Sequence, residues 1–391
     1  MTTLSIPADA PTLAEAYVRI QNGGTIMLAP GRYVLDETLL IEKPITLESA
    51  GGDVTITSAE ADITIRVTAN AHIRGIKIEN TKPNPNPKSD TDEDEEDDDS
   101  EGDGEPEIPM YALWITSGAG KVTDCEIVSA TNGVGISGRS ADPEIRNCRI
   151  HHCGEYGINV EDDARGNIVA CEIYENTNDG ICVNGHGNAP RVTGCKIHHG
   201  KDCGISIWDA GGEYRDCEIY ENKSVGIFVV GPGCNPRITA CRIHHEKENG
   251  ITVMGGAGGE YRDCEIYENE STGMMVAGAE CDPQVTGCKI YRGKSSGISF
   301  GEGAGGHFKN CDIYENEDGV FAFDPGTSPA FIGCNIHHSN HLGVRVLLGA
   351  GGEFRENRLY ENRGGNWEVP GFFASLFART KLIRVDNEPN K

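Results

Sequence analysis

Cysteine recurs through the central part of this chain at intervals of only 22 to 24 residues. Isoleucine follows each of these cysteines by two positions, and a Gly-Ile-x-Val motif or a close variant comes about nine residues later. A third short alternation, such as EYRD or PRIT, precedes each cysteine. The repeated unit therefore predicts three short strands and leaves no room for a helix. The recurring cysteines are Cys125, Cys148, Cys171, Cys195, Cys217, Cys241, Cys264, Cys288, Cys311 and Cys334, and Asn357 takes the next position.

A unit of about 23 residues cannot bury its own apolar face, but it can form one coil and stack on the next coil. The sequence therefore predicts an all-β fold, a right-handed parallel β-helix with three short strands per coil. Equivalent residues then lie about 4.8 Å apart along the axis. We interpret the cysteine column as reduced, inward-facing thiols that stack on one another, and not as disulfides or metal ligands. No metal and no cofactor are assigned.

The repeat also has a two-coil period. The residue after each cysteine alternates in sign, beginning with Glu126, Arg149 and Glu172, which predicts favourable pairs between neighbouring coils. In the turns that follow, Tyr-Glu-Asn alternates with His-His. Metal binding or acid–base chemistry is one interpretation of the paired histidines, but their repetition favours stacking, because a catalyst needs a single site. The pairs are His151–His152, His198–His199, His244–His245 and His337–His338, and Tyr291–Arg292 replaces one of them.

Both ends and one insertion depart from the repeat. Residues 1–24 are predicted to form an N-terminal capping segment, with a short helix over 10–20, and residues 25–366 the β-helix domain. The acidic stretch 81–110 has no apolar periodicity and predicts a disordered loop. This loop is either a solvated spacer or a segment that attracts a basic partner or cations. Residues 367–391 are predicted to form a C-terminal capping helix and tail. That helix, over 371–385, either covers the last coil or docks another protein.

The charge of the chain bears on its partners. Sixty-one acidic and 34 basic residues give a net charge of -27, which repels phosphate backbones and anionic lipids and argues against nucleic acid or membrane as a partner. The first residues do not read as a secretion signal, and no apolar run reaches transmembrane length. We therefore expect a cytoplasmic protein.

The Gly-Ile-x-Val strands should present the second and fourth residue after each glycine to the outside. Nine such strands give 18 outward positions, and only Glu161 and Arg345 among them are charged. A group of catalytic residues on this sheet is therefore hard to build. Apolar side chains form a long outward row instead, which is typical of a protein-binding surface. The main hypothesis is a non-catalytic β-helix scaffold that binds another protein along this face. The proposed contact residues are Trp208, Phe228, Val230, Met254, Met275, Phe321 and Phe323.

An enzymatic hypothesis remains as the alternative. Asp162–Asp163 and, one coil later, Gly185-His186-Gly187 resemble the DD and GHG motifs of polygalacturonase-type glycosidases. The alternative is a polysaccharide lyase or glycosidase that acts on an acidic sugar polymer with Asp162, Asp163 and His186. A third, purely structural possibility is that the coils stack end to end into filaments.

The repeats as a whole carry a further resemblance. The stretch NPRITACRIHHEKENGITVMGGAGGEYRDCEIYENESTGMMV, 235–276, resembles the CASH-type parallel β-helix repeats of F-box substrate-recognition proteins and their bacterial relatives, in the pectate-lyase-like superfamily. The resemblance covers about residues 112–366. It implies the right-handed β-helix fold and, from the F-box relatives, recognition of other proteins, whereas more distant members are sugar lyases, hydrolases and epimerases. The chain contains no F-box segment.

Overall fold

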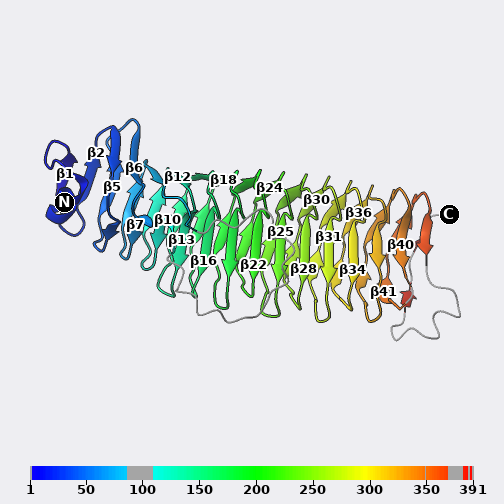
Figure 1. Cartoon of the computed structure of the whole chain (residues 1–391). Coiled ribbons are helices and arrows are strands. Elements are labelled where there is room, and N and C mark those ends of the chain that lie inside the picture. Colours follow the sequence, from blue (N-terminus) through cyan, green and yellow to red (C-terminus); the bar gives the residue numbers. More distant parts are fainter. Residues whose placement is uncertain (1, 86–108, 348, 369–381, 386–387, 390–391) are drawn as a thin grey trace.

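Every β-ladder among the described residues is parallel, and the coils follow one another along a single axis with the two termini at opposite ends (Figure 1). The structure is a computed structural model that describes residues 2–85, 109–347, 349–368, 382–385 and 388–389. Successive strands pass from a first to a second to a third sheet and then return to the first, one coil further on. The predicted all-β parallel β-helix with three strands per coil is confirmed.

The first sheet contains the strands that precede the cysteines, and within the described residues it has 16 strands. Their bounds are β1 (Thr3–Ile6), β2 (Thr25–Leu28), β5 (Thr46–Ser49), β8 (His72–Arg74), β11 (Lys121–Thr123), β14 (Glu144–Arg146), β17 (Asn167–Val169), β20 (Arg191–Thr193), β23 (Glu213–Arg215), β26 (Arg237–Thr239), β29 (Glu260–Arg262), β32 (Gln284–Thr286), β35 (His307–Lys309), β38 (Ala330–Ile332), β41 (Gly352–Arg355) and β44 (Leu382–Val385).

The second sheet begins directly after the cysteines and has 15 strands in the same described ranges. They are β3 (Gly31–Val34), β6 (Val54–Ser58), β9 (Lys77–Asn80), β12 (Glu126–Ser129), β15 (Arg149–His151), β18 (Glu172–Tyr174), β21 (Lys196–His198), β24 (Glu218–Tyr220), β27 (Arg242–His244), β30 (Glu265–Tyr267), β33 (Lys289–Tyr291), β36 (Asp312–Tyr314), β39 (Asn335–His337), β42 (Arg358–Tyr360) and β45 (Glu388–Pro389).

The third sheet contains the Gly-Ile-x-Val strands and has 14 strands in the part of the chain that the structure describes. They are β4 (Leu39–Ile41), β7 (Ile63–Val67), β10 (Tyr111–Ile115), β13 (Asn132–Ser137), β16 (Ile158–Glu161), β19 (Ile181–Asn184), β22 (Ile205–Trp208), β25 (Ile227–Val230), β28 (Ile251–Met254), β31 (Met274–Ala277), β34 (Ile298–Gly301), β37 (Val320–Ala322), β40 (Leu342–Val346) and β43 (Gly365–Glu368).

The cysteine and isoleucine columns form the interior, as predicted. Ile150 pairs in register with Ile173, and Ile173 with Ile197, so each isoleucine stacks on the next. All 15 cysteines are buried and none forms a disulfide. The thiol of Cys195 lies 3.5 Å from the carbonyl oxygen of Ile168, which belongs to the preceding coil. The thiol therefore packs in the bend and also reaches a backbone acceptor there.

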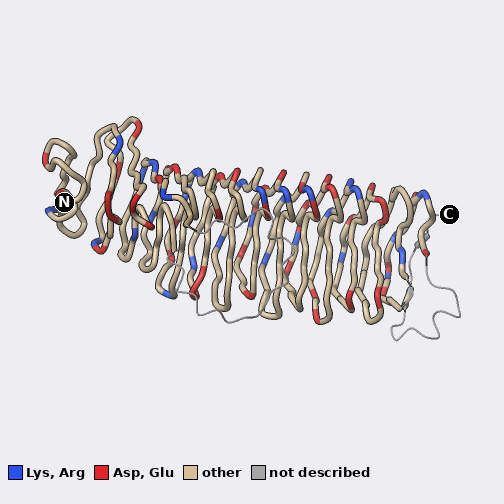
Figure 2. The backbone as a smooth tube through the Cα atoms, viewed as in Figure 1, with Lys and Arg blue, Asp and Glu red and all other residues tan. Residues whose placement is uncertain are grey.

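The outer face of the second sheet shows the predicted two-coil period. Arg242 pairs with Glu218 at 2.7 Å and Lys289 with Glu265 at 2.8 Å, each across one coil, and Figure 2 shows charges of both signs along the solenoid. The residues two positions after each charge form an uninterrupted stack of rings with centroids 4.5–5.3 Å apart. The stacked rings are His151, Tyr174, His198, Tyr220, His244, Tyr267, Tyr291, Tyr314, His337 and Tyr360.

The N-terminal helix is present as α1 (Leu13–Arg19). Thr12 caps it by accepting a hydrogen bond from the Glu15 amide, and Leu13 and Ala16 are buried. The prediction missed β1, which precedes the helix and pairs with β2 in the first sheet. Residues 2–24 therefore include a strand of the solenoid as well as the helix.

The C-terminal prediction was wrong for four residues. Leu382–Val385 form strand β44, which pairs with β41, and not the end of a helix. The alternation of the sequence LIRV fits a strand edge as well as it fits a helix face. Residues 371–381 of that predicted helix, and residues 86–108 of the predicted acidic loop, lie outside the described residues. Among the helices that the structure does describe, none is both long and apolar enough to cross a membrane.

Candidate functional site

The alternation of buried residues along each strand shows which side chains lie on the outer face of the third sheet. In β19 the side chains of Ile181 and Val183 are completely buried, so the residues between and after them face outward. Neighbouring coils approach closely at the preceding glycine, where a Cβ on Gly180 would lie 2.5 Å from Ile197 Cγ2 and 2.7 Å from the carbonyl oxygen of Gly204. Glycine at this position lets the coils stack without displacing the outer side chains.

Some residues that precede the strand glycines also reach this face, and they were not predicted from the sequence. In two coils the residue before the glycine contacts an outer side chain of the sheet. Asn249 donates a hydrogen bond to Thr252 Oγ1 at 3.2 Å, and the hydroxyl of Ser206 donates to Asp179 on the preceding coil.

The predicted apolar row lies on this face in two groups. The first group occupies β22 to β31, where Trp208 is 44% exposed and packs edge-to-face on Phe228 with ring centroids 5.3 Å apart. Trp208 pairs in register with Val230, and Val230 with Met254. Met275 lies one coil further on, opposite Thr252. These side chains form one continuous apolar patch.

The second group is small and stands apart. Phe321 and Phe323 pack on each other with centroids 5.0 Å apart, and the guanidinium of Arg345 lies 5.3 Å from the Phe321 ring. Ser299 and Gly301 on β34 separate this group from the first, and a Cβ on Gly301 would lie 2.7 Å from the Phe323 ring. The row is therefore interrupted and is not one long stripe.

A polar cluster borders the apolar patch on its N-terminal side. Asn159 Nδ2 donates to Tyr111 Oη at 3.0 Å and lies 3.1 Å from Glu161 Oε2, while its own carbonyl oxygen is buried without a hydrogen-bond partner. Burial, followed by the nearby charge of Asp162, raises the pKa of Glu161. The cluster combines an amide, a phenol and a carboxyl group that is more readily protonated than usual.

Asp179 is the most strongly perturbed acid on this face. Burial raises the pKa of its carboxyl group to about 7, and the hydrogen bond from Ser206 opposes that rise only in part. Ligand atoms of Asp179, Asp202 and Cys203 lie within 4.8 Å of one another and could hold a metal ion. Burial also raises the pKa of the neighbouring Cys182 thiol to about 12, so that thiol is protonated near neutral pH.

The residues of the enzymatic alternative lie at the edge of this face, in the loops after β16 and β19. Asp162 accepts a hydrogen bond from Ser137 Oγ at 2.6 Å, and Asp163 pairs with Arg139 at 2.7 Å. A Cβ on Gly187 would lie 1.9 Å from Asp163 Oδ1, so the loop that contains the exposed His186 packs directly on Asp163. The structure brings the two motifs together, but both carboxylates already have partners.

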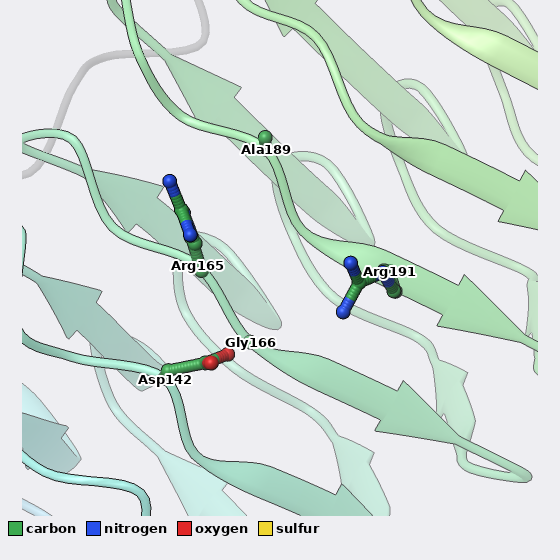
Figure 3. Close-up of a pocket in the computed structure, with 5 residues that line it drawn as sticks. All are labelled: Asp142, Arg165, Gly166, Ala189 and Arg191. Atoms are coloured by element: carbon green, nitrogen blue, oxygen red, sulfur yellow. The ribbon is translucent and has the colours of Figure 1, made fainter.

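The hollows that the described residues form lie elsewhere. A hollow of about 310 Å³ is lined by Asp142, Arg165, Gly166, Ala189 and Arg191 at the start of three first-sheet strands (Figure 3). A larger hollow of about 610 Å³ lies nearer the N-terminus and includes Asp53, Lys77 and Arg149 among its lining residues. Neither of these two hollows involves the outer face of the third sheet.

The geometry defines a parallel β-solenoid. Residues 108–238, 179–324 and 230–371 match the family described as the right handed beta helix region, and together these matches cover more than half of the chain. The protein belongs to this right-handed β-helix family. No curated protein matches the chain, so the likeness to F-box recognition proteins stays a prediction.

Solved structures of the same fold resemble it at low identity. The catalytic unit of a GH87 α-1,3-glucanase from Streptomyces thermodiastaticus is 15% identical over 96% of this chain, with a TM-score of 0.45, and the chain covers only 64% of that unit. The A-module of the Azotobacter vinelandii mannuronan C-5 epimerase AlgE4 is 13% identical over 94% of this chain and 89% of its own length, with a TM-score of 0.43. Likenesses at this level do not bear on activity.

Proposed function

We propose that the protein binds a linear, uncharged polysaccharide along the outer face of the third sheet, with Trp208 as the principal stacking platform. The observation that carries the proposal is the exposed indole ring of Trp208, set in a patch of half-buried apolar side chains that follows the axis of the solenoid. A sugar ring has an apolar face and a rim of hydroxyl groups, and aromatic side chains in partly wet surfaces suit such amphipathic ligands.

The polar residues around the patch favour the same class of ligand. Asn184 is exposed beside Trp208 in the register of the sheet, and the polar cluster of Asn159 and Glu161 lies on the same side of the patch. Hydrogen-bonding groups therefore border the stacking platform at its N-terminal end, where the hydroxyl groups of a sugar could reach them.

Charge decides between neutral and acidic sugars. Asp202 is exposed at the N-terminal side of the patch, and the net charge of the chain is -27. At the other end Arg345 is already paired with Glu368 at 2.9 Å. An anionic polymer would be repelled over much of its length. This argument favours a neutral polymer over the acidic polymer of the sequence-based alternative.

The binding experiment compares neutral and uronate polymers by isothermal titration calorimetry and by quenching of tryptophan fluorescence. We expect Trp208→Ala to weaken binding of a neutral polymer at least tenfold. Ile332→Ala is the matched control, because Ile332 is an exposed apolar residue (37%) on the first sheet. Absence of binding to any neutral polymer, or equal binding by Trp208→Ala, would refute the proposal, and capture of a protein on the same face would restore the scaffold hypothesis.

Cleavage of the bound polymer is a second candidate, supported by the raised pKa of Asp179. A general acid in glycoside hydrolysis must hold a proton at the working pH, and a carboxyl group with a pKa of about 7 does so. Release of reducing ends that disappears in Asp179→Asn would support it. Release that disappears in His186→Ala but persists in Asp179→Asn would assign the reaction to Asp162, Asp163 and His186 instead.

A further inference from the structure

The four histidine pairs of the second sheet share one geometry. In each pair the first histidine belongs to the ring stack, and the second, in the next residue, projects beside it with its ring turned by 79–82°. The Nδ1 atoms of the two rings face each other at 2.6–2.8 Å. This distance recurs at every His-His sequence in the chain, so it is a property of the repeat.

The opposite nitrogens of both rings face carboxylates. In the second histidines Nε2 lies 2.5–3.1 Å from a glutamate on the next coil, as His199 does from Glu221 at 2.7 Å. Among the stacked histidines only His337 has Nε2 within hydrogen-bond distance of a carboxylate, Asp312 at 3.1 Å, whereas Nε2 of the other three lies 3.5–3.7 Å from one and is buried without a hydrogen-bond partner. A carboxylate favours N–H at Nε2, which leaves the lone pair of a neutral imidazole at Nδ1. At this distance the two Nδ1 atoms either share a proton as an N–H···N hydrogen bond or, with both protons lost, direct two lone pairs at one bound cation.

The second histidine of each pair lies at a position where the backbone is left-handed. That position has a φ of 53–58° in every coil from His152 to Glu361, yet it is always His, Glu or Arg. A long side chain in this left-handed region costs about 1 kcal/mol. The left-handed position before each of the ten recurring cysteines holds Gly, Ala, Asn or Asp instead. The second-histidine position therefore differs from that position in carrying only long polar side chains, which can reach the neighbouring coils.

One coil shows directly that a positive charge belongs at this position. Tyr291–Arg292 replaces the His-His pair there, and the Arg292 guanidinium lies 3.5 Å from Glu268 and 2.7 Å from Glu315. A permanent cation thus occupies the column at the coil that lacks a histidine pair. A bound cation would give each histidine pair the same charge balance.

We propose that each His-His pair is a two-nitrogen chelate for a divalent late transition-metal ion such as Ni²⁺ or Cu²⁺, with water completing the coordination. At a metal–nitrogen distance of about 2.0–2.1 Å, two nitrogens at a right angle lie about 2.9 Å apart, whereas two at a tetrahedral angle lie about 3.4 Å apart. The spacing of 2.6–2.8 Å matches the right-angle case, which octahedral and square-planar ions adopt. The glutamates at Nε2 of the second histidines hold those rings in the ligating tautomer.

The test uses the full chain without a histidine tag. Calorimetric titration with Ni²⁺ at pH 7.5, in an Asp202→Asn background that removes the Asp179–Asp202–Cys203 group, should give four sites per chain. A background with His152→Gln, His245→Gln and His338→Gln keeps only the pair at 198–199 and should bind one ion. In that background His199→Gln should abolish the site, and Glu221→Gln should weaken it about 10- to 100-fold because the ring loses its orienting carboxylate. Circular dichroism of each variant checks that the solenoid is intact.

Two further variants complete the test. His307→Gln changes a histidine outside the pairs and should leave four sites. Tyr291→His with Arg292→His should create a fifth. Cu²⁺ in the single-pair background should show an electron paramagnetic resonance signal with two coupled nitrogens. No Ni²⁺ binding, or a stoichiometry that His199→Gln leaves unchanged, would mean that the imidazoles share only a proton and would overturn the proposal.

Discussion

A single buried glutamate should make the stability of this protein depend on pH. Glu246 is completely buried at a turn where alternate coils place asparagines such as Asn222 and Asn269. Its carboxyl group accepts hydrogen bonds from the backbone amide of Asn222 at 2.8 Å and from its side chain at 3.4 Å. No cation is among these partners. Burial raises the pKa of Glu246 to about 8, the bonds from Asn222 oppose this, and Glu221 adds to it.

The direction and size of the effect follow from proton linkage. Between pH 4.5, the ordinary pKa of glutamate, and about pH 8, the folded state holds a proton on Glu246 that the unfolded state has lost. The free energy of unfolding therefore falls as pH rises through this window, by about 1.36 kcal/mol per pH unit at most. Over the whole window the loss approaches about 5 kcal/mol, and between pH 5.5 and pH 8 it is about 3 kcal/mol.

The assay is urea unfolding at pH 5.5, 7 and 8, followed by circular dichroism, for the wild type and Glu246→Gln. The neutral amide has no proton to lose, so the stability of the variant relative to the wild type should rise by about 3 kcal/mol across this range. Glu248→Gln removes an exposed charge from the same coil and should not change the wild-type profile. A constant difference between wild type and Glu246→Gln would show that the carboxyl group titrates alike in both states and would refute the reasoning.

Two other predictions follow from the packing of the coils. In Gly204→Ala the new Cβ would lie 2.4 Å from Ile219 Cγ2, so we expect a loss of about 1–3 kcal/mol in urea unfolding. Gly194→Ala, where no atom lies within 4 Å and Ala170 and Ala240 take the equivalent position, should lose no more than about 1 kcal/mol; similar losses would contradict the packing argument. Because all 15 cysteines are buried, an aromatic disulfide reagent should label no thiol in the folded protein and 15 after unfolding, and rapid labelling of the native state would contradict their burial.

The fold could be predicted from the sequence because it depends on one quantity, the spacing of 22 to 24 residues between successive cysteines. Once the period is fixed, alternation assigns Ile173 and Cys171 to the interior and Glu172 to the outside, and the ladders confirm each assignment. The two misassigned segments lie outside the repeat. Strand β1 shows itself only through its pairing with β2, and β44 only through its pairing with β41.

The candidate site was harder to predict because it depends on contacts that counting along a strand does not reveal. Alternation describes the residues after each glycine, but Asp179 precedes one and reaches the outer face only because the chain bends there. The hydroxyl of Tyr111 accepts a hydrogen bond from Asn159, which lies two coils away along the axis. The Asp-Gly sequence in NDGICV was a usable signal for Asp179, since an acid before a buried strand needs a partner.

The stacking of coils places bases beside the carboxylates on the outer surface, but among the described residues it places no base beside the buried carboxyl group of Glu246. Glu126 is partly buried, which by itself raises a carboxyl pKa, yet bases one coil away on either side, Lys77 and Arg149, outweigh that effect and lower its pKa. Burial raises the pKa of Glu246, and the neutral asparagines that flank it along the axis supply no cation to offset that rise. In a parallel solenoid every residue meets its counterparts one coil away. The neighbouring coils therefore decide whether a charged residue stabilises the stack, and the histidine pairs, placed between columns of carboxylates, are where the stack can accept an added cation.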